Sequence, residues 1–118
     1  MLINLSNHPV ASWSAEQVAE AERCYGAVED MTFPNIPPEW SSEQVLALCN
    51  VVADAIQAKS CTAVHVMGEM TFTFGLVFRL HERGIPVVAS TSERLVETYP
   101  DGRKLVVFRF KQFRPYTF

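Results

Sequence analysis

The sequence predicts a small doubly wound α/β domain, and three observations lead to that prediction. Short apolar runs alternate with longer amphipathic runs, so strands and helices are expected to alternate. Strands separated by helices imply parallel pairing, right-handed crossovers and helices on both faces of the sheet. An Asp-Gly pair between two alternating runs near the end indicates a β-hairpin. We therefore expect a Rossmann-like fold of four mainly parallel strands and three helices, plus a C-terminal antiparallel hairpin.

The first half of the chain supplies two strands and a capped helix. Residues 1–5 are apolar enough for a short buried strand. Ser14 and Gln17 have capping-box spacing and predict a helix that runs to Gly26, a typical helix terminator. Residues 27–33 form the second predicted strand, and the three prolines that follow favour an extended loop.

The second half supplies two more helix–strand units and the hairpin. Ser41 and Gln44 repeat the capping-box spacing, and the following apolar residues fall on one helical face: Val45, Leu46, Leu48, Cys49, Val52, Ala53 and Ile56. A buried strand is predicted over 63–67 and an apolar helix over 70–83, ended by Gly84. The remaining predicted segments are a fourth strand at 85–89 and hairpin strands at 94–99 and 104–113.

Length and composition limit the class of protein. The 118 residues are enough for one hydrophobic core, so we expect a single domain over residues 1–118. Ten Lys and Arg against thirteen Asp and Glu give a net charge of −3, which disfavours a binder of long nucleic acids but permits a compact anionic ligand.

No apolar run approaches the roughly 20 residues that cross a bilayer, and no signal peptide is apparent, so no membrane partner is expected. Cys24, Cys49 and Cys61 lack zinc-site or disulfide patterning, which favours a reducing cytoplasm.

Ligands of open parallel sheets bind beyond the carboxyl ends of the strands. Three polar segments, 6–9, 68–73 and 90–94, each follow a predicted strand. We therefore expect these segments to lie at the same edge of the sheet and to form the site.

The segment 68–73 has features of a simple anion cradle. Gly68 permits close backbone approach, and Thr71 and Thr73 lie at a helix start, where free N–H groups favour an anion. Thr71 can equally be a plain helix cap. Glu69 can orient a base or a ribose hydroxyl, or simply be a favourable charge at the helix N-terminus. Phosphate-loop and dinucleotide fingerprints are absent.

The other two segments offer a histidine, an arginine and several hydroxyls. His8 can transfer a proton near neutral pH, or can be a turn histidine bonded to local backbone. Arg94 can hold a phosphate in a fork geometry, or can be a solvated strand-end residue. The hydroxyls of residues 90–92 can bind ligand or satisfy turn backbone. His65, inside a predicted strand, is expected to be buried and structural. No metal site is predicted.

The segments Asn4–Pro9, Met67–Phe74 and Ala89–Arg94 resemble those of small stand-alone proteins of type III CRISPR loci that have a CARF-like Rossmann domain. Several such families are ring nucleases. The resemblance implies an antiviral nucleotide-binding protein whose ligand is a cyclic oligoadenylate, most often the tetra-adenylate, bound across a homodimer. The implied reaction needs no metal or cofactor: a ribose 2′-hydroxyl attacks its own phosphate and leaves a 2′,3′-cyclic phosphate end, which ends the signal.

Roles within this resemblance are assigned from position in the chain. His8 is expected to transfer a proton and Arg94 to stabilise phosphate charge. The expected ligand-binding residues are Ser6, Asn7, Gly68, Glu69, Thr71, Thr73, Ser90 and Thr91. The alternative is a protein of the same antiviral system that binds, sequesters or senses the cyclic nucleotide without cleaving it. A third possibility is an interaction module with an unrelated ligand.

Overall fold

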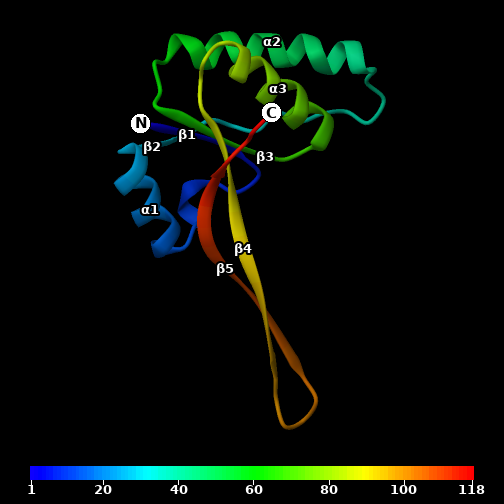
Figure 1. Cartoon of the computed structure of the whole chain (residues 1–118). Helices are drawn as coiled ribbons and strands as arrows, with labels where there is room; N and C mark the ends of the chain where they lie inside the picture. The colour runs from blue at the N-terminus through cyan, green and yellow to red at the C-terminus, as the bar shows by residue number, and fades with distance from the viewer.

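The computed structural model describes residues 1–118 and has an α/β architecture (Figure 1). A five-stranded mixed sheet has the order β2-β1-β3-β4-β5, in which only the β4–β5 pair is antiparallel. This confirms three helices and a mostly parallel sheet with a C-terminal antiparallel pair. The elements are β1 (Leu2–Ser6), a 3₁₀ turn η1 (Val10–Ser12), α1 (Ala15–Tyr25), β2 (Val28–Asp30), α2 (Ser42–Ala58), β3 (Ala63–Met67), α3 (Met70–Glu82), β4 (Val87–Thr98) and β5 (Lys104–Pro115).

The predicted helix caps are present in the structure. Ser14 caps α1, its hydroxyl accepting from the Gln17 amide at 3.1 Å. Ser41 and Gln44 form a reciprocal capping box on α2, with bonds of 2.8 and 3.3 Å. Gly26 ends α1 with a φ of +84°, a backbone conformation that residues with a Cβ rarely adopt. Local side-chain chemistry therefore sets these helix boundaries, as the sequence indicates.

The helices cover both faces of the sheet, as expected for a doubly wound arrangement. Helices α2 and α3 pack on one face, and α1 lies on the other (Figure 1). On the α2–α3 face, alternate strand residues such as Ile3, Leu5, Val64 and Val66 join a core cluster of 13 buried residues. On the α1 face the corresponding cluster has only 5 buried residues. Most of the hydrophobic core thus lies on one side of the sheet.

Strand β4 corrects the predicted division of the C-terminal region. The sequence pattern places a strand at 85–89, a polar loop at 90–94 and a separate hairpin strand, whereas β4 runs unbroken from Val87 to Thr98. The polar segment is a strand because β5 pairs with it, from Ser90 opposite Phe113 to Arg94 opposite Phe108, with one bulge in β5 between these pairs. Pairing satisfies its backbone groups, so small hydroxyl residues here need no turn. The sheet therefore has five strands rather than six.

The distal parts of β4 and β5 form a two-stranded arm that projects from the body (Figure 1). The Cα radius of gyration is 16.2 Å. A compact chain of this length would have a radius of about 13–14 Å. One arm ion pair, Lys111 to Glu93 at 2.9 Å, links the two strands. None of the helices combines the length and apolar content needed to cross a bilayer.

Candidate functional site

A cleft of about 590 Å³ opens on the α1 face, at the carboxyl ends of β1 and β3. The chain leaves β1 toward β2 on one side and returns to β3 on the other, so this is the point where strand order reverses. Ligands of open α/β sheets bind at such a position. The cleft is lined by Ser6, Asn7, His8, Ser12, Trp13, Ser14, Gln17, His65, Met67, Gly68, Ser90, Ser92, Phe108 and Phe110.

The floor of the cleft arises from a change of side-chain polarity along the strands. Residues at spacing two share a face of the sheet. On the α1 face each strand begins with an apolar residue and becomes more polar or polarisable toward its carboxyl end: Leu2, Asn4 and Ser6 in β1; Ala63, His65 and Met67 in β3; Val88, Ser90 and Ser92 in β4. The apolar ends pack under α1, and the opposite ends form the cleft.

Asn4, buried in β1, holds the polar residues of the floor together. Its amide nitrogen donates to the His8 carbonyl at 2.9 Å and to the Asp30 carboxylate at 2.8 Å. Its amide oxygen accepts from the Ser6 hydroxyl at 2.8 Å and lies 2.9 Å from Nδ1 of His65. Because both partners of the nitrogen are acceptors, the amide orientation is fixed. Every polar atom of this side chain is satisfied, as a buried amide requires.

His65 is buried, as the sequence indicates, and it also lines the cleft. Its Nδ1 faces the Asn4 oxygen, which can only accept, so Nδ1 carries the proton. Its Nε2 therefore presents a lone pair to the Ser90 hydroxyl, 3.1 Å away. Burial, with a smaller contribution from the nearby His8, lowers the pKa of His65 to about 4. The ring is therefore neutral at physiological pH.

An aromatic wall encloses the imidazole of His65. Trp13 and Phe113 both meet it edge to face, with ring centroids 5.3 and 5.7 Å away. The indole of Trp13 also donates to the His8 carbonyl at 3.0 Å. A bulge in β5 opposite Thr91 and Ser92 lets Phe110 and Phe113 contact each other, with centroids 5.0 Å apart. The cleft thus combines hydroxyl groups with aromatic surface.

Half of the predicted site residues come together in this cleft. Ser6, Asn7 and His8 follow β1, Gly68 follows β3, and Ser90 lies in β4, and all five line the cleft. Gly68 is also tightly packed, because a Cβ there would lie 2.2 Å from the Phe33 ring. The convergence expected for the ends of β1, β3 and β4 is therefore present in part.

The start of α3 differs from the expected anion cradle. Glu69 caps this helix: its carboxylate accepts from the amides of Thr71 and Phe72, both at 2.9 Å, and from the Thr71 hydroxyl at 2.7 Å. These bonds lower the pKa of Glu69, the Phe72 amide contributing most. The chain's own carboxylate thus takes the N–H groups expected to face a ligand. Thr73, one turn on, has a buried hydroxyl without a hydrogen-bond partner.

The remaining predicted residues lie outside the cleft lining. Glu69 and Thr71 line a separate pocket beside the loop at 36–40. Thr91 donates to the Gln112 carbonyl at 3.3 Å. Arg94 pairs with Phe108 across the arm, so both side chains occupy the same face of the hairpin, one step beyond Ser92. No Lys or Arg side chain lines the cleft itself.

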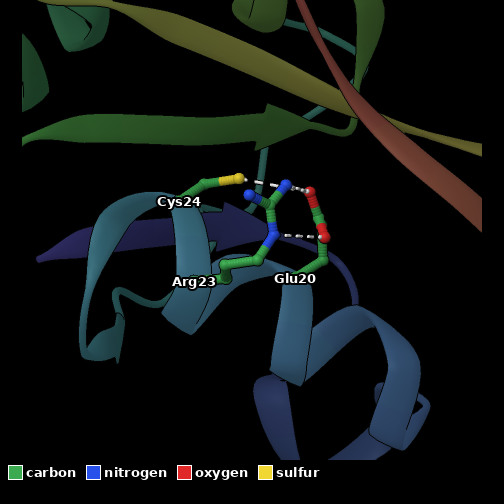
Figure 2. Close-up of polar contacts among 3 residues, drawn as sticks. All are labelled: Glu20, Arg23 and Cys24. Carbon is green, nitrogen blue, oxygen red and sulfur yellow. Dashed lines mark hydrogen bonds and ion pairs between the residues drawn. The ribbon is translucent and has the colours of Figure 1, made fainter.

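The cysteines lie outside the cleft and are unpaired. Figure 2 shows the most exposed one, Cys24 on α1, whose thiol donates to Glu20 at 3.2 Å while Arg23 pairs with the same carboxylate. The bond to Glu20 raises the pKa of Cys24, and burial raises the pKa values of Cys49 and Cys61. A protonated thiol is a poor nucleophile. At a given pH these three thiols are therefore less nucleophilic than a free cysteine.

Sequence reasoning missed three contributors to the site. Asn4 organises the floor, Trp13 forms part of the wall, and His65 takes part in the hydrogen-bond chain to Ser90. The period-two pattern of polar residues within otherwise buried strands is the signal that identifies Asn4 and His65. Trp13 depends on the η1 turn, which has no comparable sequence signal.

The fold and cleft define an α/β protein with a polar, aromatic-walled cleft at the carboxyl edge of its parallel strands. Residues 1–114 match the model of the family described as uncharacterized protein MJ1673 family, and the chain belongs to that family. Among curated proteins, none matches this chain.

Proposed function

We propose that the cleft binds a cyclic oligoadenylate, specifically cyclic tetra-adenylate, across a homodimer, and degrades it as a metal-independent ring nuclease. The products carry 2′,3′-cyclic phosphate ends, and the reaction ends type III CRISPR signalling in a cytoplasmic antiviral response. The fold is accordingly taken as Rossmann-like of the CARF type. The observation that carries the proposal is the position and chemistry of the cleft, with hydroxyls and aromatic rings together at the strand-order reversal.

The cleft has complementary groups for each part of a nucleotide. The hydroxyls of Ser6, Ser90 and Ser92 suit ribose and phosphate oxygens, and the Asn7 amide adds donors and acceptors. Trp13 and Phe108 offer faces on which a base can stack. The substrate supplies the nucleophile, so the protein needs only to align it and to stabilise charge.

The exposed surface and the charge of the projecting arm favour a second copy of this chain as the binding partner. The arm's exposed apolar residues are more than a free hairpin needs and lie on both of its faces: Val96, Val106 and Phe108 on the cleft face, and Leu105 and Val107 on the opposite face, each at least 41% exposed. Residues 87–118 carry six basic and three acidic side chains, whereas residues 1–86 carry four and ten. The positive arm of one copy therefore complements the negative body of another, and a twofold axis would use both contacts.

Dimerisation would also supply the cationic side chains that the cleft of a single copy lacks. Arg94 lies beside Phe108 on the cleft face of its own arm and is exposed. In a pair, arms from both copies can bring such residues over phosphates that neutral hydroxyls alone bind weakly. A ring of identical nucleotides matches two identical half-sites, which makes Arg94 the proposed phosphate-binding residue.

The direct test incubates the purified protein with cyclic tetra-adenylate in EDTA and separates the products by chromatography. We expect linear product with cyclic phosphate ends, and slower turnover in Arg94→Ala and in His8→Ala. Arg83→Ala is the matched control, because Arg83 pairs with Asp54 on α2, away from the cleft. No product at stoichiometric enzyme would reject the nuclease.

The same incubation distinguishes the second candidate function. Tight, dimer-dependent binding with intact ligand recovered would indicate a sequestering or sensing protein. The absence of any Lys or Arg in the cleft lining favours this alternative, because charge stabilisation in the transition state is then weak in each single copy. No binding of any cyclic oligoadenylate by calorimetry would indicate an unrelated ligand.

A further inference from the structure

We propose that Ser90 and His65 form the proton-accepting side of this cleavage site, with Ser90 contacting the substrate and His65 acting through it. This inference rests on the proposed ring-nuclease function. Ser90 is the catalytic residue in the strict sense, because it lines the cleft that would hold the substrate. His65 is a positioning residue that receives the proton, and it was expected only to support the fold.

The geometry forms a chain of hydrogen bonds from the cleft into the sheet. The Ser90 hydroxyl lies 3.1 Å from Nε2 of His65, and Nδ1 of the same ring lies 2.9 Å from the Asn4 oxygen. The amide of Asn4 in turn donates to the Asp30 carboxylate at 2.8 Å. Serine, imidazole and a third group that orients the ring is the arrangement that activates hydroxyls in enzymes of unrelated folds.

The tautomer required for this role is imposed by the fold. Asn4 fixes the ring proton on Nδ1, so Nε2 is free to accept. The Ser90 hydroxyl has one other hydrogen-bond partner, the sulfur of Met67 at 3.2 Å. A thioether is a weak acceptor, so the hydroxyl proton favours the imidazole lone pair. Burial keeps the ring uncharged at neutral pH and makes it a weaker base than a free imidazole, so its role here rests on the Nε2 lone pair being aimed at the Ser90 hydroxyl.

The proposed step balances without any additional reactant. The ribose 2′-hydroxyl transfers its proton to the Ser90 oxygen while Ser90 passes its own proton to Nε2 of His65. The 2′-oxygen bonds to phosphorus, and the bond from phosphorus to the 5′-oxygen breaks. The leaving 5′-oxygen takes a proton from the ring of His8, which lines the cleft. Solvent then takes the proton from His65 and returns one to His8, so there is no net change in protons.

The groups around His65 determine which titrations affect the pH dependence of the cleavage rate. The charged or titratable groups facing it are His8 from the loop after β1 and, through Asn4, Asp30 from β2. The contacts from η1–α1 and β5 are the neutral rings of Trp13 and Phe113. The rate of the chemical step should therefore fall on the acid side as His65 becomes protonated, and this acid limb should disappear when His65 is replaced.

The test measures single-turnover cleavage of cyclic tetra-adenylate with enzyme in excess, together with ligand affinity. Ser90→Ala and His65→Gln should each lower the rate by about 10²-fold or more while the Kd stays within a few-fold. The two effects should not multiply in the double variant, because both residues belong to one relay. His81→Gln is the matched histidine control: that ring lies on α3, stacked on Phe118, and is exposed.

Each outcome is decisive. A wild-type protein that does not cleave rejects the proposed function and this inference with it. A wild-type protein that cleaves, with Ser90→Ala equally fast, overturns the relay and leaves the ring nuclease standing. If His65→Gln fails to fold, as a melting curve would show, Ser90→Ala decides, because it removes one half-buried hydroxyl oxygen. Retention of the acid limb in His65→Gln would also contradict the relay.

Discussion

The two faces of the sheet come from the same strands but have opposite compositions. On the face under α2 and α3, strands β1 and β3 are apolar along their whole length, and their residues join a core of 13 buried side chains. The face under α1 is apolar only at the amino ends of the strands and contains the buried polar residues Asn4, Ser6 and His65. The single short helix on that side leaves the carboxyl ends uncovered. The main hydrophobic core and the candidate site thus lie on opposite faces of the same sheet.

The largest expected effect is loss of the apolar face. Leu5→Ala removes a fully buried side chain from the 13-residue cluster and should lower the free energy of unfolding by about 2–5 kcal/mol. Chemical denaturation measures it. Val51→Ala, at a position 64% exposed on α2, should change stability by less than about 0.5 kcal/mol. Equal effects of the two substitutions would contradict the comparison.

The polar face should make stability depend on pH through His65. Its pKa is about 4 in the folded protein against 6.5 for the free side chain. The unfolded chain therefore binds more protons between these values. Stability is full above pH 6.5, falls by up to about 3 kcal/mol as the pH drops to 4, and loses nothing further from this group below that. Unfolding measured across this window should show a shallower slope in His65→Gln, and an unchanged slope would refute the assignment.

The third prediction concerns the buried amide of the polar face. Asn4→Ala leaves the Nδ1 proton of His65 without its buried acceptor and removes one of the two acceptors of the Ser6 hydroxyl, the other being the His8 carbonyl at 3.1 Å. The free energy of unfolding should fall by about 1–3 kcal/mol, less than for Leu5→Ala. Asn35→Ala, at an exposed loop position, is the matched control. A neutral Asn4→Ala would mean that the floor of the cleft is not held by this network.

The smallest expected effect lies on the outer side of α1. Because the bond to Glu20 raises the pKa of the exposed Cys24 thiol, alkylation of Cys24 should be slower than that of a free thiol at the same pH. Glu20→Gln should accelerate it, as followed by mass spectrometry of the modified peptide. Equal rates in the two proteins would show that this contact does not persist in solution.

The sequence predicted the helices and parallel strands well because their signals are local. Capping serines, terminating glycines and apolar periodicity act within a few residues. The continuous β4 was not predictable in the same way, because the segment from Ser90 to Arg94 is a strand only through its pairing with β5.

The candidate site likewise has features that local sequence patterns predict and features that depend on tertiary contacts. Ser6, His8 and Ser90 were identified because strand ends in parallel sheets converge. The closure of the α3 N-terminus by Glu69 depends on one side-chain rotamer that bends back onto its own helix. The wall formed by Trp13 and Phe113 joins residues 100 positions apart, and no local pattern encodes that contact.

The most direct test of the account is a map of backbone amide shifts by NMR as cyclic tetra-adenylate is added. We predict shift changes concentrated at the carboxyl ends of the strands on the α1 face, at Asn7, Gly68 and Ser90, with the α2–α3 core unaffected. Changes centred on Thr71 at the start of α3, or no changes at all, would contradict it.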